Sequence, residues 1–133
     1  MTPADLRALA VRVLSKETSL ELETAVLEAM GWEYIEKDHL WAKFVPPDDY
    51  ENRTFVQLPR PYASHDDAFA AIPEGWRLRT IAQTDDGYVA KLGKGTFSVH
   101  NAYTPVPDLP RALTAISMIA RAVDLEDERK ATP

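Results

Sequence analysis

Ser64, His65, Asp66 and Asp67 place a hydroxyl, an imidazole and two carboxylates in direct succession. These are the residue types of a serine–histidine–acid nucleophilic site. Neighbouring residues in the first turn of a helix point about 100° apart, so these side chains cannot form the hydrogen-bonded chain that such a site needs. The same run fits a helix start, with Ser64 as the N-cap and acids favoured by the helix dipole. We therefore expect a capped helix and no catalytic residues here.

Metal and phosphate binding find equally little support in the spacing of the residues. Gly93-Lys94-Gly95 is too short for a phosphate-binding loop and predicts a tight turn. The chain has no cysteine, which excludes disulfides, thiol catalysis and cysteine-based zinc sites. The candidate metal ligands match no known spacing and are His39, His65, His100, Asp48, Asp49, Asp66 and Asp67. We expect neither a metal nor a cofactor.

The charge balance argues against nucleic acid as a partner. With 15 basic and 21 acidic residues, the chain carries a net charge of −6 and repels phosphate backbones. The nearest approach to a basic, aromatic face lies in a nearly neutral stretch, where a solvated strand face is the simpler interpretation. No apolar run approaches the roughly 20 residues that span a bilayer, and the first residues carry no basic signal region. We expect a cytoplasmic protein that binds neither nucleic acid nor membrane.

Hydrophobic spacing predicts four helical segments. The first begins at Thr2-Pro3, and the second begins with a Thr18–Glu21 capping box and ends at Gly31. The third starts at Ser64, and its core stripe includes Phe69. The last is long and mostly buried, because its apolar arc is wide. It follows Asp108 and carries a polar stripe, and residues 126–133 are expected to form a frayed tail. The polar stripe consists of Arg111, Thr114, Ser117, Arg121 and Asp124.

Strand patterns lie between these helices. Trp32–Ile35 and Leu40–Val45 predict a hairpin, and Thr54–Leu58 predicts a short extended piece. Hairpin-length turns join three further segments into an antiparallel meander: Trp76–Thr84, Tyr88–Leu92 and Thr96–Tyr103. Grouped strands without crossover spacing favour an α+β fold in a single domain, residues 1–133, with an antiparallel sheet covered by helices as an α/β/α sandwich.

Three stretches of the chain also resemble the phage ABA sandwich domain family, and the resemblance runs from about Leu14 to Val123. The most telling part is the alanine-rich segment that ends in Pro73-Glu74-Gly75-Trp76. The others are Ser19-Leu20-Glu21-Leu22-Glu23 leading to Gly31-Trp32, and Pro105 to Ala115. The resemblance implies a small phage- or prophage-encoded protein with a sheet between helices. It implies no catalytic residues.

These observations favour a non-enzymatic binding or interaction protein of phage origin in the bacterial cytoplasm, with a protein partner. Two alternatives stay open. A hydrolase would use Asp48, Asp49, Asp66 or Asp67, although no spacing fixes their roles. A binder of a nucleotide-like small molecule would combine charge-assisted contacts with stacking, through Arg60, Tyr62, His65, Arg77 and Arg79.

Exposed strand edges predict a homodimer. Trp41–Val45 and Thr54–Leu58 offer apolar side chains beside an edge, and unpaired edges are templates for pairing with a second chain. The competing interpretation is a monomer, because the prolines on either side of these segments protect the edge.

Overall fold

The computed structural model describes residues 1–15, 17–35, 40–43 and 64–131, which form an α+β fold. In chain order the elements are α1 (Pro3–Leu14), α2 (Leu20–Ala29), β1 (Trp32–Ile35), β2 (Leu40–Lys43), α3 (His65–Ala70), β3 (Arg77–Thr84), β4 (Gly87–Lys94), β5 (Phe97–His100) and α4 (Leu109–Ala131). The expected α+β class with an antiparallel sheet is confirmed.

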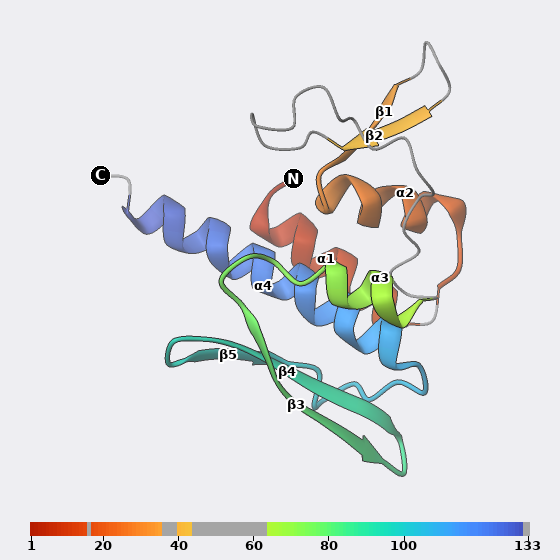
Figure 1. Ribbon diagram of the computed structural model, residues 1–133, viewed down its shortest axis with the longest axis vertical. Coiled ribbons are helices and arrows are strands. Elements are labelled where there is room, and N and C mark those ends of the chain that lie inside the picture. The colour runs from red at the N-terminus through yellow and green to blue at the C-terminus, as the bar shows by residue number, and fades with distance from the viewer. Residues whose placement is uncertain (16, 36–39, 44–63, 132–133) are drawn as a thin grey trace.

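Helix α4 is the central element of the molecule. The three-stranded sheet β3–β4–β5 lies on one side of it, and α1 and α3 lie on the other, with α2 and the β1–β2 hairpin farther from the sheet (Figure 1). The described helices thus pack on one face of this sheet. A second helical layer, as in an α/β/α sandwich, stays a prediction.

Two hydrophobic clusters meet along α4. One joins α4 to α1 and α2, the other joins it to α3, β4 and β5, and Ile119 packs against both. The predicted wide apolar arc of this helix is confirmed, and even polar members of its stripe are buried. The hydroxyls of Thr114 and Ser117 donate to the carbonyls of Pro110 and Leu113, one turn earlier, at 2.8 and 2.7 Å. These bonds satisfy the hydroxyls inside the core.

The sheet is an antiparallel meander, as predicted, with β4 in the middle. Its pairing shifts between Leu78 and Thr80, so Arg79 is the extra residue of a β-bulge. Strand β5 ends at His100 and not, as expected, at Tyr103. The strand ends there because the side chain of Asn101, the next residue, forms the hydrogen bonds to β4 that a strand backbone would form.

Where β5 ends, the side chain of Asn101 bonds the backbone of β4 in place of a further strand residue. Its Oδ1 accepts from the backbone N–H of Ala90 at 2.8 Å, and its Nδ2 donates to the carbonyls of Tyr88 and Thr104 at 3.0 and 3.3 Å. The side chain is buried, so these bonds satisfy polar groups that water cannot reach. Asparagine here replaces a strand residue, and the backbone turns away after His100.

The helix starts follow the predicted chemistry with one correction. Thr2 is the N-cap of α1, as expected from Thr2-Pro3, and it also forms a capping box with Asp5. The predicted Thr18 cap is wrong, because Ser19 is the N-cap of α2 and its Oγ accepts from the N–H of Leu22 at 3.1 Å. Ser19 has the extended backbone of an N-cap, so the helix begins one residue later than a Thr18 cap requires.

Phe69 does not belong to the core, contrary to the expectation. It is 42% exposed on α3, whereas its neighbour Ala68 is fully buried against α4. A helix of six residues presents only a narrow face to its neighbour, and this face passes through Ala68 and on to the half-buried Ile72. Adjacent helical residues point about 100° apart, which turns Phe69 outward.

The tail expected to fray, residues 126–133, is helical up to Ala131, and its fraying stays a prediction. Arg7 of α1 donates two parallel hydrogen bonds to the carboxylate of Glu126, from Nε and Nη2, each 3.1 Å long. A contact with a helix 119 positions earlier in the chain stabilises this end of α4, and a local sequence pattern cannot reveal it.

The first hairpin is confirmed by the antiparallel pairing of β1 with β2. Trp32 is partly buried against the cluster between α1, α2 and α4. The end of the predicted second strand, residues 44–45, and the predicted extended piece Thr54–Leu58 lie outside the described residues.

Candidate ligand-binding site

The residues predicted to bind a small molecule do not all fall in the described part of the chain. Arg60 and Tyr62 lie outside it. His65 is the exposed first residue of α3, and Arg77 and Arg79 are exposed in the first half of β3. Within the described ranges, no hydrogen bond or ion pair joins His65 to either arginine.

Arg79 has a structural contact of its own. Its Nη2 donates to the carbonyl of Gly95 at 2.8 Å, in the turn after β4. The side chain lies so close over Gly93 that a Cβ there would collide with it. Gly93 therefore provides room for an arginine, and Gly95, with φ +61°, makes the tight turn predicted for this run.

The run of residues from Ser64 to Asp67 is a helix start, as predicted. Ser64 is the N-cap of α3, and its Oγ accepts from the N–H of Asp67 at 3.4 Å. Among the residues that the structure describes, no three histidine, aspartate or glutamate side chains gather as metal ligands would. His39, Asp48 and Asp49 lie outside those residues.

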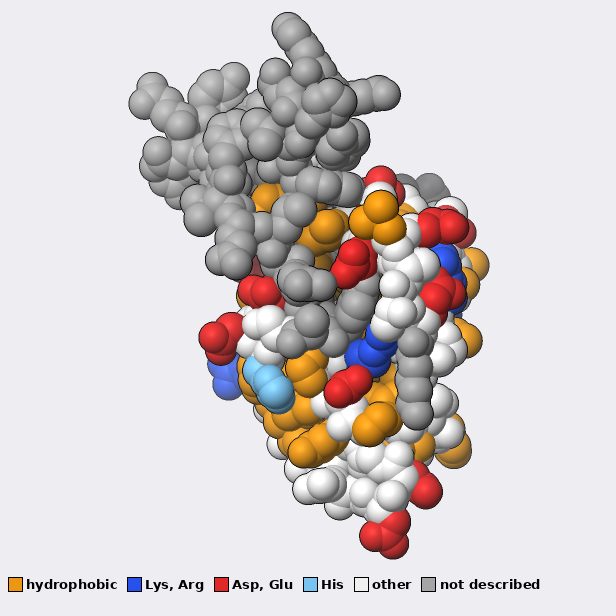
Figure 2. All heavy atoms as spheres, turned by 90° about the vertical axis from the view of Figure 1, so that its right-hand side faces the viewer, with side chains coloured by type: hydrophobic (Ala, Val, Ile, Leu, Met, Phe, Trp, Pro, Cys, Tyr) orange, Lys and Arg blue, Asp and Glu red, His pale blue; other side chains and the backbone are white. Residues whose placement is uncertain are grey.

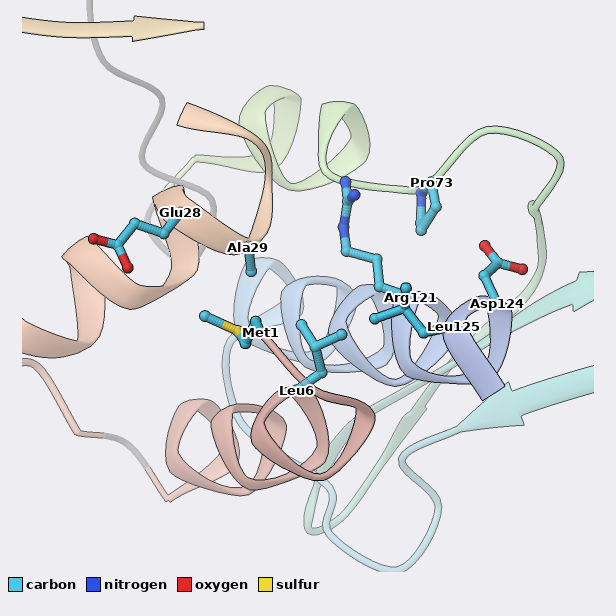
Figure 3. Close-up of a pocket in the computed structure, with 8 residues that line it drawn as sticks. All are labelled: Met1, Leu6, Glu28, Ala29, Pro73, Arg121, Asp124 and Leu125. Carbon is cyan, nitrogen blue, oxygen red and sulfur yellow. The ribbon is translucent and has the colours of Figure 1, made fainter. Parts of the chain in front are cut away.

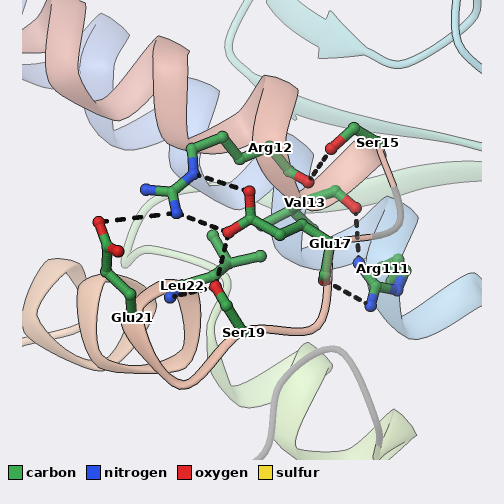
Figure 4. Close-up of polar contacts among 8 residues, drawn as sticks. All are labelled: Arg12, Val13, Ser15, Glu17, Ser19, Glu21, Leu22 and Arg111. Carbon is green, nitrogen blue, oxygen red and sulfur yellow. Dashed lines mark hydrogen bonds and ion pairs between the residues drawn. The ribbon is translucent and has the colours of Figure 1, made fainter.

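A polar network holds the turn between α1 and α2 against α4 (Figure 4). Arg111, only 4% exposed, donates to the carbonyls of Val13 and Glu17 at 2.9 and 2.8 Å. The cation lies at the C-terminal end of α1, where the helix dipole favours positive charge. Arg12 donates to the Glu17 carboxylate, which also accepts from Ser19. All these groups have partners within the protein, so the network supports the fold.

The strongest candidate for a ligand site is a cavity of about 340 Å³ between α1, α2, α4 and the segment after α3 (Figure 3). This volume lies at the small end of the range for ligand pockets. Most of the walls are apolar. The cavity is lined by Met1, Leu6, Glu28, Ala29, Pro73, Arg121, Asp124 and Leu125.

Arg121 is the distinctive polar group of this cavity. Its Nη2 donates to the carbonyl of Ala71 at 3.0 Å, whereas its Nε is buried with no hydrogen-bond partner in the described part of the protein. Burial lowers the pKa of Arg121, and nearby Asp124 partly offsets this effect. A guanidinium nevertheless stays protonated in proteins. The half-buried cation is therefore charged and has an unused donor, which is costly unless an anion compensates it.

The acidic residues of the lining do not supply that anion. Asp124 accepts from Trp76 Nε1 through Oδ2 at 3.0 Å and from Lys94 Nζ through Oδ1 at 2.9 Å. Both of its oxygens are therefore engaged, and the contact raises the pKa of Lys94. The carboxylate of Glu28 is directed away from Arg121 in Figure 3.

A second cavity of about 300 Å³, between α1 and α2, lacks this property. Its cation is Arg12, whose Nε and Nη2 already donate to Glu17. The hydrogen bonds to Glu17 raise the pKa of Arg12, opposite in direction to the shift at Arg121. Of these two cavities, only the one at Arg121 combines apolar walls with a cation that has a donor to spare.

The sequence pattern had placed Arg121 on the polar stripe of the last helix without any role. The available signal was its position, since a lone arginine stands between Ile119-Ala120 and Ala122-Val123 in a helix whose apolar arc is wide. The other residues of the cavity come from four separate segments, and no local spacing joins them.

Comparison with known proteins adds no assignment. No family model, no curated protein and no solved structure matches this chain. No helix of the described residues is long and apolar enough to cross a membrane. The resemblance to the phage ABA sandwich domain family stays a prediction.

Proposed function

We propose that this protein is a non-enzymatic binder of a small amphipathic anion, held in the cavity beside Arg121. Two observations carry the proposal: the buried Nε of Arg121 has no hydrogen-bond partner among the described residues, and Arg121 lines an otherwise largely apolar cavity. A carboxylate or phosphate would accept from this donor in a charge-assisted hydrogen bond. A small-molecule binder was one of the alternatives from the sequence. The proposed site is now the cavity at Arg121, and not the residues that the sequence suggested.

The walls define the rest of the ligand. Leu6, Ala29, Pro73 and Leu125 favour an aliphatic or aromatic body, and the flexible side chain of Met1 adapts to its shape. The limited volume favours a small molecule over a peptide. The ligand class is therefore a small organic acid or phosphate with an apolar body.

A matched series of eight-carbon probes tests this proposal. Octanoate and octyl phosphate carry an anion, whereas octanol and octylamine have the same body without one. We expect the two anions to raise the melting temperature of the protein and the other two probes to leave it nearly unchanged, because ligand binding stabilises the folded state.

Variants assign the effect to the site. Arg121→Gln should abolish the stabilisation by octanoate, and Ala29→Phe should do the same by filling the cavity while Arg121 stays in place. Arg7→Gln, on the exposed face of α1, is the control and should respond like the original protein. Equal stabilisation by octanol, or full stabilisation of a folded Arg121→Gln protein, would overturn the proposal.

A further inference from the structure

Strand β3 forms an edge of the three-stranded sheet in the described part of the chain. All eight of its residues except the half-buried Leu78 are exposed, and the strand contains neither proline nor lysine. Ile81, near its middle, is a large hydrophobic side chain that is 41% exposed. An open edge of this kind is a template for another strand unless proline, lysine or a bulge blocks it.

The bulge blocks only one end of this edge. It lies at Arg79, so Thr80–Thr84 remains a regular five-residue segment, with each residue paired in register to β4. The free side of this segment offers backbone donors and acceptors to a further strand.

The charges of β3 are complementary to a second copy of the same strand in the antiparallel direction. Arg77 and Arg79 lie at the start of the strand, and Asp85 and Asp86 follow its end. Figure 2 shows acidic side chains at the lower end of the molecule, where the turn between β3 and β4 lies. None of the four takes part in an ion pair within the described ranges, although Nη2 of Arg79 donates to the carbonyl of Gly95.

We propose that this edge pairs with β3 of a second copy about a two-fold axis at Ala82, giving a homodimer with a continuous six-stranded sheet. In this register Thr80 lies opposite Thr84 of the other copy, and Arg79 lies opposite Asp85. Each opposite-charge pair occurs twice, because a two-fold interface uses the same residues from both copies. This interface is independent of the cavity at Arg121 and differs from the edges that the sequence suggested.

The axis at Ala82 gives a sharp test, because any charge placed there faces its own copy. By sedimentation equilibrium we expect a dimer for the original chain and a dissociation constant at least about tenfold higher for both Ala82→Arg and Ala82→Asp. An equimolar mixture of the two variants should dimerise again as a heterodimer. Glu74→Arg, in an exposed turn, is the control for added charge and should leave the dimer unchanged.

The register has its own check. Arg79→Asp and Asp85→Arg should each weaken the dimer, and the double variant should restore it, with circular dichroism confirming that each variant is folded. A single species of 14.9 kDa for the original chain at micromolar concentration would overturn the proposal. A dimer that tolerates both Ala82 variants would overturn it as well.

Discussion

Trp76 shows how one side chain connects three elements. It is 6% exposed in the cluster between α3, the sheet and α4, and its Nε1 donates to Asp124 of α4. The Lys94 Nζ atom, bound to the same carboxylate, lies 6.0 Å from the centre of the Trp76 ring. The tryptophan and the lysine together fix the end of β4 against the last helix.

Replacing Trp76 with alanine should therefore be among the more damaging single changes in this core. We expect Trp76→Ala to lower the free energy of unfolding by about 3–5 kcal/mol, because it leaves a large cavity and removes the hydrogen bond to Asp124. Denaturant titration measures this loss. Tyr103→Ala, at a fully exposed aromatic, is the control, and a loss under about 1 kcal/mol at Trp76 would contradict the packing described here.

Glu17 makes stability depend on pH at the same scale. Its pKa is lowered by the hydrogen bonds from Arg12, first, and from Ser19. A carboxylate whose pKa is lower in the folded state stabilises the fold above its unfolded pKa, and the stabilisation disappears as pH falls through the folded value. In Glu17→Gln the free energy of unfolding should therefore fall less between pH 5 and pH 3, a range around the ordinary pKa of about 4.3.

The partner variant checks the cause of this effect. Arg12→Met removes the main donor and should flatten the acid dependence in the same direction. If the difference in unfolding free energy between Glu17→Gln and the original protein stays constant across this pH range, the ion pair does not stabilise the fold.

At the scale of the elements, the close approach of β4 to the segment before α4 depends on one glycine. Gly87 has φ +135°, and Tyr88 exchanges backbone hydrogen bonds with Val106. A Cβ at Gly87 would collide with the backbone of Val106. Gly95 also has a positive φ, +61°, but nothing lies within 4 Å of the place a Cβ would take.

This pair of glycines gives a matched comparison. Gly95→Ala incurs the moderate strain of the left-handed region, whereas Gly87→Ala combines the clash with a φ of +135°, which lies outside that region. We expect Gly95→Ala to lower the unfolding free energy by about 1–2 kcal/mol, and Gly87→Ala by about 1–3 kcal/mol more. Thermal or denaturant unfolding of the two variants measures these differences. Equal losses of unfolding free energy would show that the backbone at Val106 can move to make room for the added Cβ.

At the scale of the whole molecule, local patterns in the sequence predict the helices and strands. They do not predict which of these elements pack against one another. The Thr2 cap, the Ser64 cap and the meander follow from residue types and spacing over a few positions. Phe69 and the length of α4 could not be predicted in this way, because both depend on contacts with distant segments. Asn101 is a third case, since its side chain replaces strand backbone.

The candidate site was even less accessible from the sequence. Its cavity forms only when α1, α2 and the segment after α3 pack around α4, and a lone arginine in a helix gives no sign of an unpaired Nε. The clusters that stood out in the sequence were local, such as the run from Ser64 to Asp67, and local runs of this kind cap helices. The residues of the candidate site are dispersed along the chain, and the packing of the helices brings them together.

The most direct measurement is the resonance of the Arg121 Nε–H group in a nitrogen-labelled protein during titration with octanoate. This resonance reports directly on the donor that the proposed function requires. It is assigned by its absence from the spectrum of the Arg121→Lys variant. We predict that the Nε–H resonance shifts progressively to saturation with octanoate and stays in place with octanol. A resonance that does not move while octanoate binds elsewhere, or that moves equally with octanol, would contradict an anion site at Arg121.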